Sequence, residues 1–276
     1  MASHALGAAY MKSIFPTLVV LLVFGTVGIG CRRTSARSVS LLGSTSIQPF
    51  AEMLAERYAK DHPGEFVEVQ GGGSTAGLQA AESGLANIGM CSRSLTAKEA
   101  LVFTSILIAR DGLALVVNRE NPVVKLSVEQ VRALFAGRIT NWNEVGGQEG
   151  PIRPITREEG SGTRESFVRL VMGSERIAGR ALTQESNGAV KELVKGDPAA
   201  IGYMSLGLVG KELKPVAMDG IQPTVENVLA GRYHLVRPLL FVTKGTVNAA
   251  AQKFIDYVLS SQGQSLLASE GLVSLQ

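Results

Sequence analysis

The chain has 276 residues, of which 45% are hydrophobic, and its formal net charge is +3 at pH 7. This length suits one large domain or two moderate ones, and so small a charge argues against a nucleic-acid-binding protein. Of the two cysteines, Cys31 follows an apolar segment and Cys91 lies further along the sequence, so no internal disulfide can form if Cys31 is modified.

The N-terminal 30 residues have the pattern of a secretory signal. No charged residue lies between Lys12 and Arg32, and the mostly apolar stretch 14–29 leads into small residues before Cys31. A basic residue, a short apolar core and small residues before a cysteine are typical of lipoprotein signals, whereas a membrane-spanning helix needs about 20 apolar residues. The pattern therefore predicts a signal peptide at 1–30 and a protein that works outside the cytoplasm.

A lipid on Cys31 would attach the processed protein to a membrane, with residues 31–38 as the anchor and a short linker. Two features leave alternatives open. Translation could begin at Met11 instead of Met1, because the residues between them add no Lys or Arg. Gly28 stands where lipoprotein signals usually carry leucine, so an uncleaved anchor is the alternative to a processed signal.

Short apolar runs alternate with helical patterns along the rest of the chain. The runs that predict strands are 39–43, 66–70, 87–92, 113–118, 151–156 and 200–206. The patterns that predict helices are 47–60, 75–84, 127–137, 162–173, 187–196, 225–231 and 250–271, the last with a break at Gly263. Strands that alternate with helices predict an α/β fold with a parallel sheet covered on both faces.

Two α/β lobes fit this order better than one barrel. The extended stretches 115–123 and 232–242 could each cross from one lobe to the other, and the C-terminal helices would then return to the first lobe. We therefore expect lobe 1 to comprise 39–118 plus 236–276 and lobe 2 to comprise 119–235, with the ligand cleft between them.

Three clusters rich in Ser and Gly each follow a predicted strand and open a predicted helix. They are GSTSIQPF at 43–50, GGGSTAGL at 71–78 and EGSGTRESF at 159–167. The first N–H groups of a helix lack partners and carry partial positive charge, so such helix starts bind anions with neutral donors. One Ser or Thr before a helix is commonly a plain N-cap, but three clusters with Arg93 and Arg157 nearby predict an oxyanion site.

In these clusters the chain resembles the phosphate-specific substrate-binding proteins of ABC importers. The resemblance runs through 43–64, 69–93, 155–167 and 200–207, and its most specific motif is Arg-x-x-Gly-Ser-Gly-Thr at 157–163. It implies a type II periplasmic-binding-protein fold, in which two lobes joined by two crossover strands close over one phosphate. It also implies a permease and an ATPase of a phosphate importer as partners, and no enzymatic activity.

The resemblance further implies which residues of this chain contact inorganic phosphate. The residues that match the family's ligands are Thr45, Ser46, Ser74, Arg157, Ser161, Gly162 and Thr163, with the adjacent Ser44 as a further candidate. Arg93 stands where many members carry an aspartate that accepts a proton from the bound anion, and we expect it to offer a guanidinium fork instead. Glu159 matches a position that is acidic in the family, so we expect it to pair with Arg157, and we expect Glu159 or backbone carbonyl groups to favour phosphate over sulfate.

Other functions remain as alternatives. Sulfate, molybdate and tungstate are the nearest competing ligands, because all are oxyanions. A serine hydrolase would use Ser74 or Ser161 with His234 as the base, since His62 lies in the turn-like stretch 60–64, but neither serine lies in a Gly-x-Ser-x-Gly motif. The Gly-rich run 71–76 is a weak nucleotide-binding signal. No metal-ligand spacing is present in the sequence, and we expect no cofactor.

Overall fold

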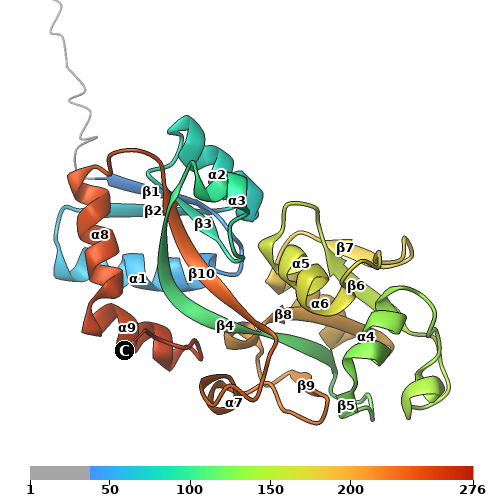
Figure 1. Cartoon of the computed structure of the whole chain (residues 1–276). Helices are drawn as coiled ribbons and strands as arrows, with labels where there is room; N and C mark the ends of the chain where they lie inside the picture. The colour runs from blue at the N-terminus through green and yellow to red at the C-terminus, as the bar shows by residue number, and fades with distance from the viewer. Residues whose placement is uncertain (1–37, 276) are drawn as a thin grey trace, which may run out of the picture. The chain divides into compact units, whose positions relative to one another are not determined.

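The computed structural model describes residues 38–275 (Figure 1). The predicted signal peptide, both candidate start residues and the predicted lipidation site Cys31 lie outside this range. Within it, no helix combines the length and the apolar character needed to cross a membrane.

Ten strands form one mixed sheet, in the order β2-β1-β3-β10-β4-β8-β6-β7, with β9 beside β4 and β5 beside β9. Their bounds are β1 Ser38–Gly43, β2 Phe66–Gly71, β3 Ile88–Cys91, β4 Thr104–Asn118, β5 Lys125–Leu126, β6 Arg153–Arg157, β7 Leu182–Gln184, β8 Ala200–Ser205, β9 Leu213–Met218 and β10 Val236–Thr243. The pairs β1–β2, β1–β3 and β6–β8 are parallel, as predicted. The pairs β6–β7 and β5–β9 are also parallel, but β5, β7 and β9 were not predicted as strands. The prediction was wrong for the middle of the sheet, because β10 is antiparallel to β3 and β4, and β4 is antiparallel to β8 and β9.

The α-helices are α1 Gln48–Asp61, α2 Ser74–Ser83, α3 Ala97–Ala100, α4 Val128–Phe135, α5 Gly162–Phe167, α6 Asn187–Gly196, α7 Val225–Leu229, α8 Ala249–Leu259 and α9 Ser261–Ser269. A π-helical turn, Val168–Met172, continues α5. The C-terminal helical pattern breaks at Ser260, three residues before the predicted break, because the Ser260 side chain accepts from the Gly263 N–H and caps α9. Gly263 instead allows close packing, since a Cβ there would lie 2.4 Å from the carbonyl oxygen of Tyr257.

Buried apolar side chains form two large cores. The first core joins α1, α8 and α9 to β1 and β3 and includes Leu41, Tyr58 and Phe254. The second core joins α4, α5 and β8, where the rings of Phe167 and Tyr203 stack at 4.0 Å. Each core therefore stabilises a different part of the α/β fold.

Strands β4 and β10 lie side by side and contribute to both cores (Figure 1). In β4, Ile108 and Ala109 pack in the first core, whereas Leu113, Leu115 and Val117 pack in the second. In β10, Val236 packs against the second core, and Leu239 and Phe241 lie in the first. The two strands thus run from one core to the other.

Candidate functional site

Three loops at the ends of strands bring the predicted hydroxyl groups together. The β1–α1 loop carries Ser46, whose Oγ lies 2.8 Å from Oγ1 of Thr163 at the start of α5. In the same loop, Thr45 Oγ1 accepts a hydrogen bond of 3.0 Å from Nη2 of Arg157, at the end of β6. Segments about 110 residues apart in the sequence therefore meet at one buried polar cluster.

Glycines allow this close approach. Gly43 has φ of +141°, and a Cβ there would lie 2.3 Å from the carbonyl oxygen of Met90. A Cβ on Gly162 would lie 2.2 Å from Oγ of Ser74 and 2.7 Å from Oγ of Ser92. The start of α5 can therefore reach the start of α2 only because residue 162 has no side chain.

Ser74, at the first position of α2, and Ser44 are linked through Ser92, which the sequence analysis missed. Ser44 donates to Oγ of Ser92 at 2.8 Å, and the Ser92 N–H donates to Oγ of Ser74 at 3.0 Å. Ser161 is the N-cap of α5, and its side chain accepts from the Arg164 N–H. All of these serines are buried, so their hydroxyl groups form the interior of the cluster.

Arg157 is 1% exposed and supplies positive charge to the cluster. Its Nε and Nη2 donate to the two carboxylate oxygens of Glu158 at 2.9 Å, and to the carbonyl oxygens of Gln184 and Glu185. Among residues 38–275, its buried Nη1 has no hydrogen-bond partner. One donor of this guanidinium is therefore free to bind an anion.

The predicted pairing of Glu159 with Arg157 is wrong. Glu158 forms that ion pair, and Glu159 is exposed. The chain turns directly after β6, where the Ser161 N–H donates to the carbonyl oxygen of Glu158. This turn folds the Glu158 carboxylate back over the guanidinium and leaves Glu159 on the outside.

A second buried ion pair lies beside the cluster and was also missed. Arg237 in β10 donates through Nη1 to Thr163 Oγ1 at 2.7 Å and through Nη2 to Ser46 Oγ at 3.0 Å. Its Nε and Nη2 also donate to Oδ2 of Asp111 in β4, at 2.9 and 2.8 Å. Burial raises the pKa of the Asp111 carboxyl, while the charge of Arg237 and its hydrogen bonds act in the opposite direction.

Asn187, at the first position of α6, completes the surroundings of Ser46. It donates to Oγ of Ser46 at 2.9 Å, and its Oδ1 accepts from the Ser205 N–H. One signal of the missed ion pair is present in the sequence, because Asp111 and Arg237 are charged residues inside apolar extended segments. Asn187 and Ser92 offered no such signal, since each looks like an ordinary residue beside a helix or strand.

Arg93, like Glu159, is a candidate that the structure does not bring to the cluster. Side chains alternate as the chain leaves β3, so Ser92 faces the cluster and Arg93 faces away from it. Its guanidinium binds Glu99 through two hydrogen bonds of 2.8 and 2.9 Å and forms an ion pair with Glu165. Burial lowers the pKa of Arg93, but the hydrogen bond to Glu99 and the nearby negative charges raise it by more.

The geometry does not support the hydrolase alternative. His62 and His234 are both exposed, and within residues 38–275 neither forms a hydrogen bond to Ser74 or Ser161. The same residues contain no group of three or more His, Cys, Asp or Glu side chains placed to hold a metal ion. The cluster instead offers hydroxyl groups, helix starts and two guanidinium groups, which bind an oxyanion without reacting with it.

Comparison with known proteins identifies the family. Residues 32–262 match the model of the PBP superfamily domain. The phosphate-binding protein PstS of Bacillus subtilis is 31% identical over 242 residues, which cover 86% of this chain and 80% of that protein.

Two solved structures are similar at 38% identity. One is of a Clostridium perfringens protein described as a phosphate ABC transporter substrate-binding protein, with bound phosphate, and has a TM-score of 0.83 over 87% of this chain and all of the other. The other is of an ABC-type phosphate transport receptor from Vibrio cholerae, with a TM-score of 0.72 over 85% of this chain and 99% of that one. These relatives are described as a phosphate-binding protein, a substrate-binding protein and a transport receptor, so the family is one of solute-binding proteins and not of enzymes. The chain therefore belongs to the PBP superfamily and, within it, to the family of PstS-like phosphate-binding proteins.

Proposed function

We propose that this protein binds inorganic phosphate at the polar cluster and delivers it to an ABC importer. The observation that carries the proposal is the convergence of three helix starts with the free Nη1 of buried Arg157. The proposed ligands are Thr45, Ser46, Ser74, Arg157, Ser161, Gly162 and Thr163, with Ser44 beside them and Arg237 added from its contacts with Ser46 and Thr163.

The charges around the cluster explain how a desolvated anion could be held there. Each buried guanidinium already has a carboxylate partner, Glu158 for Arg157 and Asp111 for Arg237. The charge of the anion would therefore be met mainly by N–H and O–H donors and by the dipoles of the helix starts. Such donors can bind phosphate, sulfate or molybdate equally well. Selectivity for phosphate therefore needs a hydrogen-bond acceptor for the proton that hydrogen phosphate carries.

Binding would close two lobes over the anion. The expected division was 39–118 plus 236–276 and 119–235. We infer from the two cores that its first boundary lies near 110–112 in β4 and not at 118, because Leu113, Leu115 and Val117 pack in the second core, and that the second crossing point is near 236–238 in β10. Contacts such as Ser46 with Thr163 join the two lobes and can form only when they are closed. Phosphate would thus shift the population towards the closed form, because it contacts both lobes at once.

The proposed location is outside the cytoplasm, on a lipid anchor at Cys31. The descriptions of the C. perfringens and V. cholerae relatives support delivery to a transporter, and the N-terminal sequence supports the anchor. Expression of the full chain with Cys31→Ser tests the anchor. We expect the variant to lose incorporation of labelled fatty acid and to leave the membrane fraction, and unchanged fractionation would contradict the anchor.

The binding proposal is tested by calorimetric titration of the mature protein with phosphate, sulfate, molybdate and tungstate. Wild type should bind phosphate most tightly and release no product from a phosphomonoester. Arg157→Ala should weaken binding by about 100-fold or more, since the anion loses the free Nη1 donor and the Glu158 carboxylate is left beside it without its partner. Arg153→Ala is the matched control, because Arg153 lies in the same strand but is exposed and paired with Asp197. Equal affinities of the two variants would refute the proposed site.

A further inference from the structure

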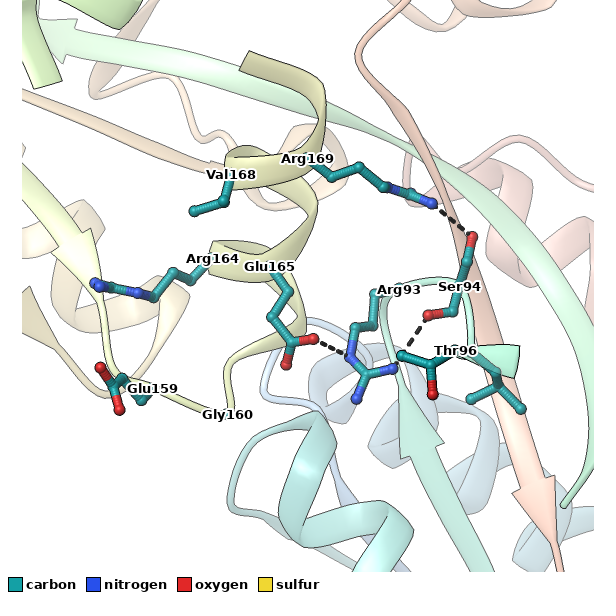
Figure 2. A pocket seen from close by; sticks show the side chains of 10 residues that line it. Arg93, Ser94, Thr96, Glu159, Gly160, Arg164, Glu165, Val168 and Arg169 are labelled. Carbon is teal, nitrogen blue, oxygen red and sulfur yellow. Dashed lines mark hydrogen bonds and ion pairs between the residues drawn. The ribbon is translucent and has the colours of Figure 1, made fainter. Parts of the chain in front are cut away.

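We propose that Arg93 and Glu165 form an ion pair that holds the closed form and so sets the rate of phosphate release. The inference rests on the proposed function, and it gives Arg93 a positioning role in place of the direct contact with phosphate that the sequence suggested. Figure 2 shows the pair between the loop after β3 and helix α5.

Contacts within its own loop and with α3 hold the Arg93 side chain in place, independently of its contact with α5. Its Nη1 and Nη2 donate to the two oxygens of Glu99 at 2.8 and 2.9 Å, and Nη1 also donates to the carbonyl oxygen of Ser94. Glu99 is held in turn by the capping box of α3, where it accepts from the Thr96 N–H at 2.8 Å. The guanidinium is therefore positioned within the loop, and only Nε remains to face the other side.

Nε of Arg93 lies 2.6 Å from Oε2 of Glu165. The Nε–H bond does not point at this oxygen, so the contact is an ion pair and not an aligned hydrogen bond. Glu165 lies two residues after the proposed ligand Thr163 in the same short helix. A rigid-body movement of α5 that separates Thr163 from Ser46 would therefore also separate Glu165 from Arg93.

A second contact spans the same gap. Nη1 of Arg169, on the π-helical turn after α5, donates to Oγ of Ser94 at 3.1 Å (Figure 2). A hollow of about 580 Å³ is lined by these side chains together with Glu159, Gly160 and Arg164. Because the pair lies at the wall of a hollow, it can separate without unpacking either core.

The pair connects elements that belong to different cores. Its loss should therefore affect the closure of the lobes and not the folding of either core. Strand β3, before the Arg93 loop, contributes Ile88 and Met90 to the first core, whereas α5 contributes Phe167 to the second. The Glu165 side chain is 40% exposed, so water can replace Arg93 as its partner when the lobes separate. The ion pair should therefore form and break with each cycle of binding, unlike the buried pair of Asp111 and Arg237.

The test compares Glu165→Gln with Glu175→Gln in the mature protein. Glu175 is the matched control, because it is a partly exposed acid beyond α5 that pairs with Arg138 and not with Arg93. We expect Glu165→Gln to raise the phosphate Kd about 3- to 10-fold, as for a partly exposed ion pair, mostly through faster dissociation. Glu175→Gln should leave both quantities unchanged. In an Arg93→Gln background, Glu165→Gln should have no further effect on the Kd.

A measurement without ligand keeps this inference separate from the phosphate assignment. Spin labels on Lys98→Cys and Ser174→Cys, both exposed positions, report the distance between the α3 region and the segment after α5, while native Cys91 is buried. We expect Glu165→Gln to shift the distance distribution of the ligand-free protein towards longer distances, and Glu175→Gln to leave it unchanged.

The outcomes distinguish the two proposals. If wild type binds no phosphate but Glu165→Gln shifts the distances, the proposed ligand is wrong and the ion pair stands. If wild type binds phosphate while Glu165→Gln changes neither dissociation nor distances, the ion pair is refuted and the binding site stands. An equal loss of affinity in Glu165→Gln and Glu175→Gln also refutes it, because the effect would not be specific to the partner of Arg93.

Discussion

Gly162 allows α5 to approach α2 closely because it has no side chain. The Cβ of alanine at this position would overlap Oγ of Ser74 and lie too close to Oγ of Ser92. We therefore predict that Gly162→Ala weakens phosphate binding by about 10-fold or more, since overpacking costs about 1–3 kcal/mol and here falls on the closed form. Isothermal titration calorimetry measures this directly.

Gly196→Ala is the control for Gly162→Ala. A Cβ at the end of α6 would have no other atom within 4 Å, and its backbone does not adopt positive φ. This variant should bind phosphate as wild type does and unfold at the same or a slightly higher temperature. Wild-type affinity in Gly162→Ala would show that the bound form does not need the contact between the two helix starts.

Selectivity for phosphate over sulfate can also be tested at a single residue. The structure makes Glu158, and not Glu159, the acid to substitute. Its carboxylate contacts Arg157, whereas the carboxylate of Glu159 is exposed. We predict that Glu158→Gln reduces the preference for phosphate over sulfate by about 10-fold, if its carboxylate accepts the proton of hydrogen phosphate. Competition titrations with both anions measure the preference. Glu159→Gln should keep the wild-type preference. If Glu159→Gln lost the preference and Glu158→Gln kept it, Glu159 would be the selective acid, as the sequence analysis expected.

The candidate site could be predicted from the sequence where its residues open helices or, like Arg157, end a strand just before one. Ser46, Ser74 and Thr163 stand at strand ends before helical patterns, and that position alone brings them to a common edge. Arg237 and Asp111 could not be assigned to the site in this way, because their contact depends on the pairing of β4 with β10 across more than 100 residues. Arg93 was misplaced because a one-residue alternation decides which side of the loop it faces.

At the scale of elements, the sequence predicted helices and strands well where their own ends carry a signal. Helix α6 spans Asn187–Gly196, the predicted range, because Ser186 caps its start and Gly196 ends its apolar pattern. Strand β4 was predicted only from 113, although it begins at Thr104. Its first half carries Arg110 and Asp111 among apolar residues, and the charges hid a strand whose stability comes from pairing with β10.

Helix α3 gives a prediction for the effect of pH. The hydrogen bond from Arg93, opposed by burial, lowers the pKa of Glu99 from 4.5 to about 2. A carboxyl group whose pKa is lower in the folded state stabilises the protein above its unfolded pKa and loses that contribution as the pH falls. We therefore predict that Glu99→Gln lowers the free energy of unfolding by about 1 kcal/mol at pH 7, and that its difference from wild type shrinks between pH 4.5 and about 2.

Urea unfolding at a series of pH values measures this difference. Glutamine can keep the capping box of α3, so the substitution removes mainly the charge. Glu129→Gln is the control, because Glu129 is exposed in the first turn of α4. A difference between wild type and Glu99→Gln that stays constant from pH 7 to pH 2 would contradict the role of the charge.

At the scale of the whole molecule, two cores are joined by two strands and by a cluster of polar contacts. The apolar cores determine the fold of each part, and alternating strands and helices made that architecture predictable from the sequence. The polar contacts between the parts are few and depend on side-chain geometry, so they could not be predicted in the same way. The proposed function requires that phosphate replaces or strengthens these contacts and thereby couples the two cores.

This coupling predicts that phosphate protects both cores equally. Leu134 in α4 lies in the second core and Leu267 in α9 lies in the first, and each is fully buried away from the polar cluster. Replacement of either leucine by alanine should lower the free energy of unfolding by about 2–5 kcal/mol. Phosphate at about 100 times its Kd should restore about 2.7 kcal/mol in both variants, because the anion binds only when both parts are folded.

Differential scanning calorimetry with and without phosphate measures these changes. If phosphate stabilised the Leu267→Ala variant but not the Leu134→Ala variant, or the reverse, the anion would bind to one part alone and closure of two lobes over it would be refuted.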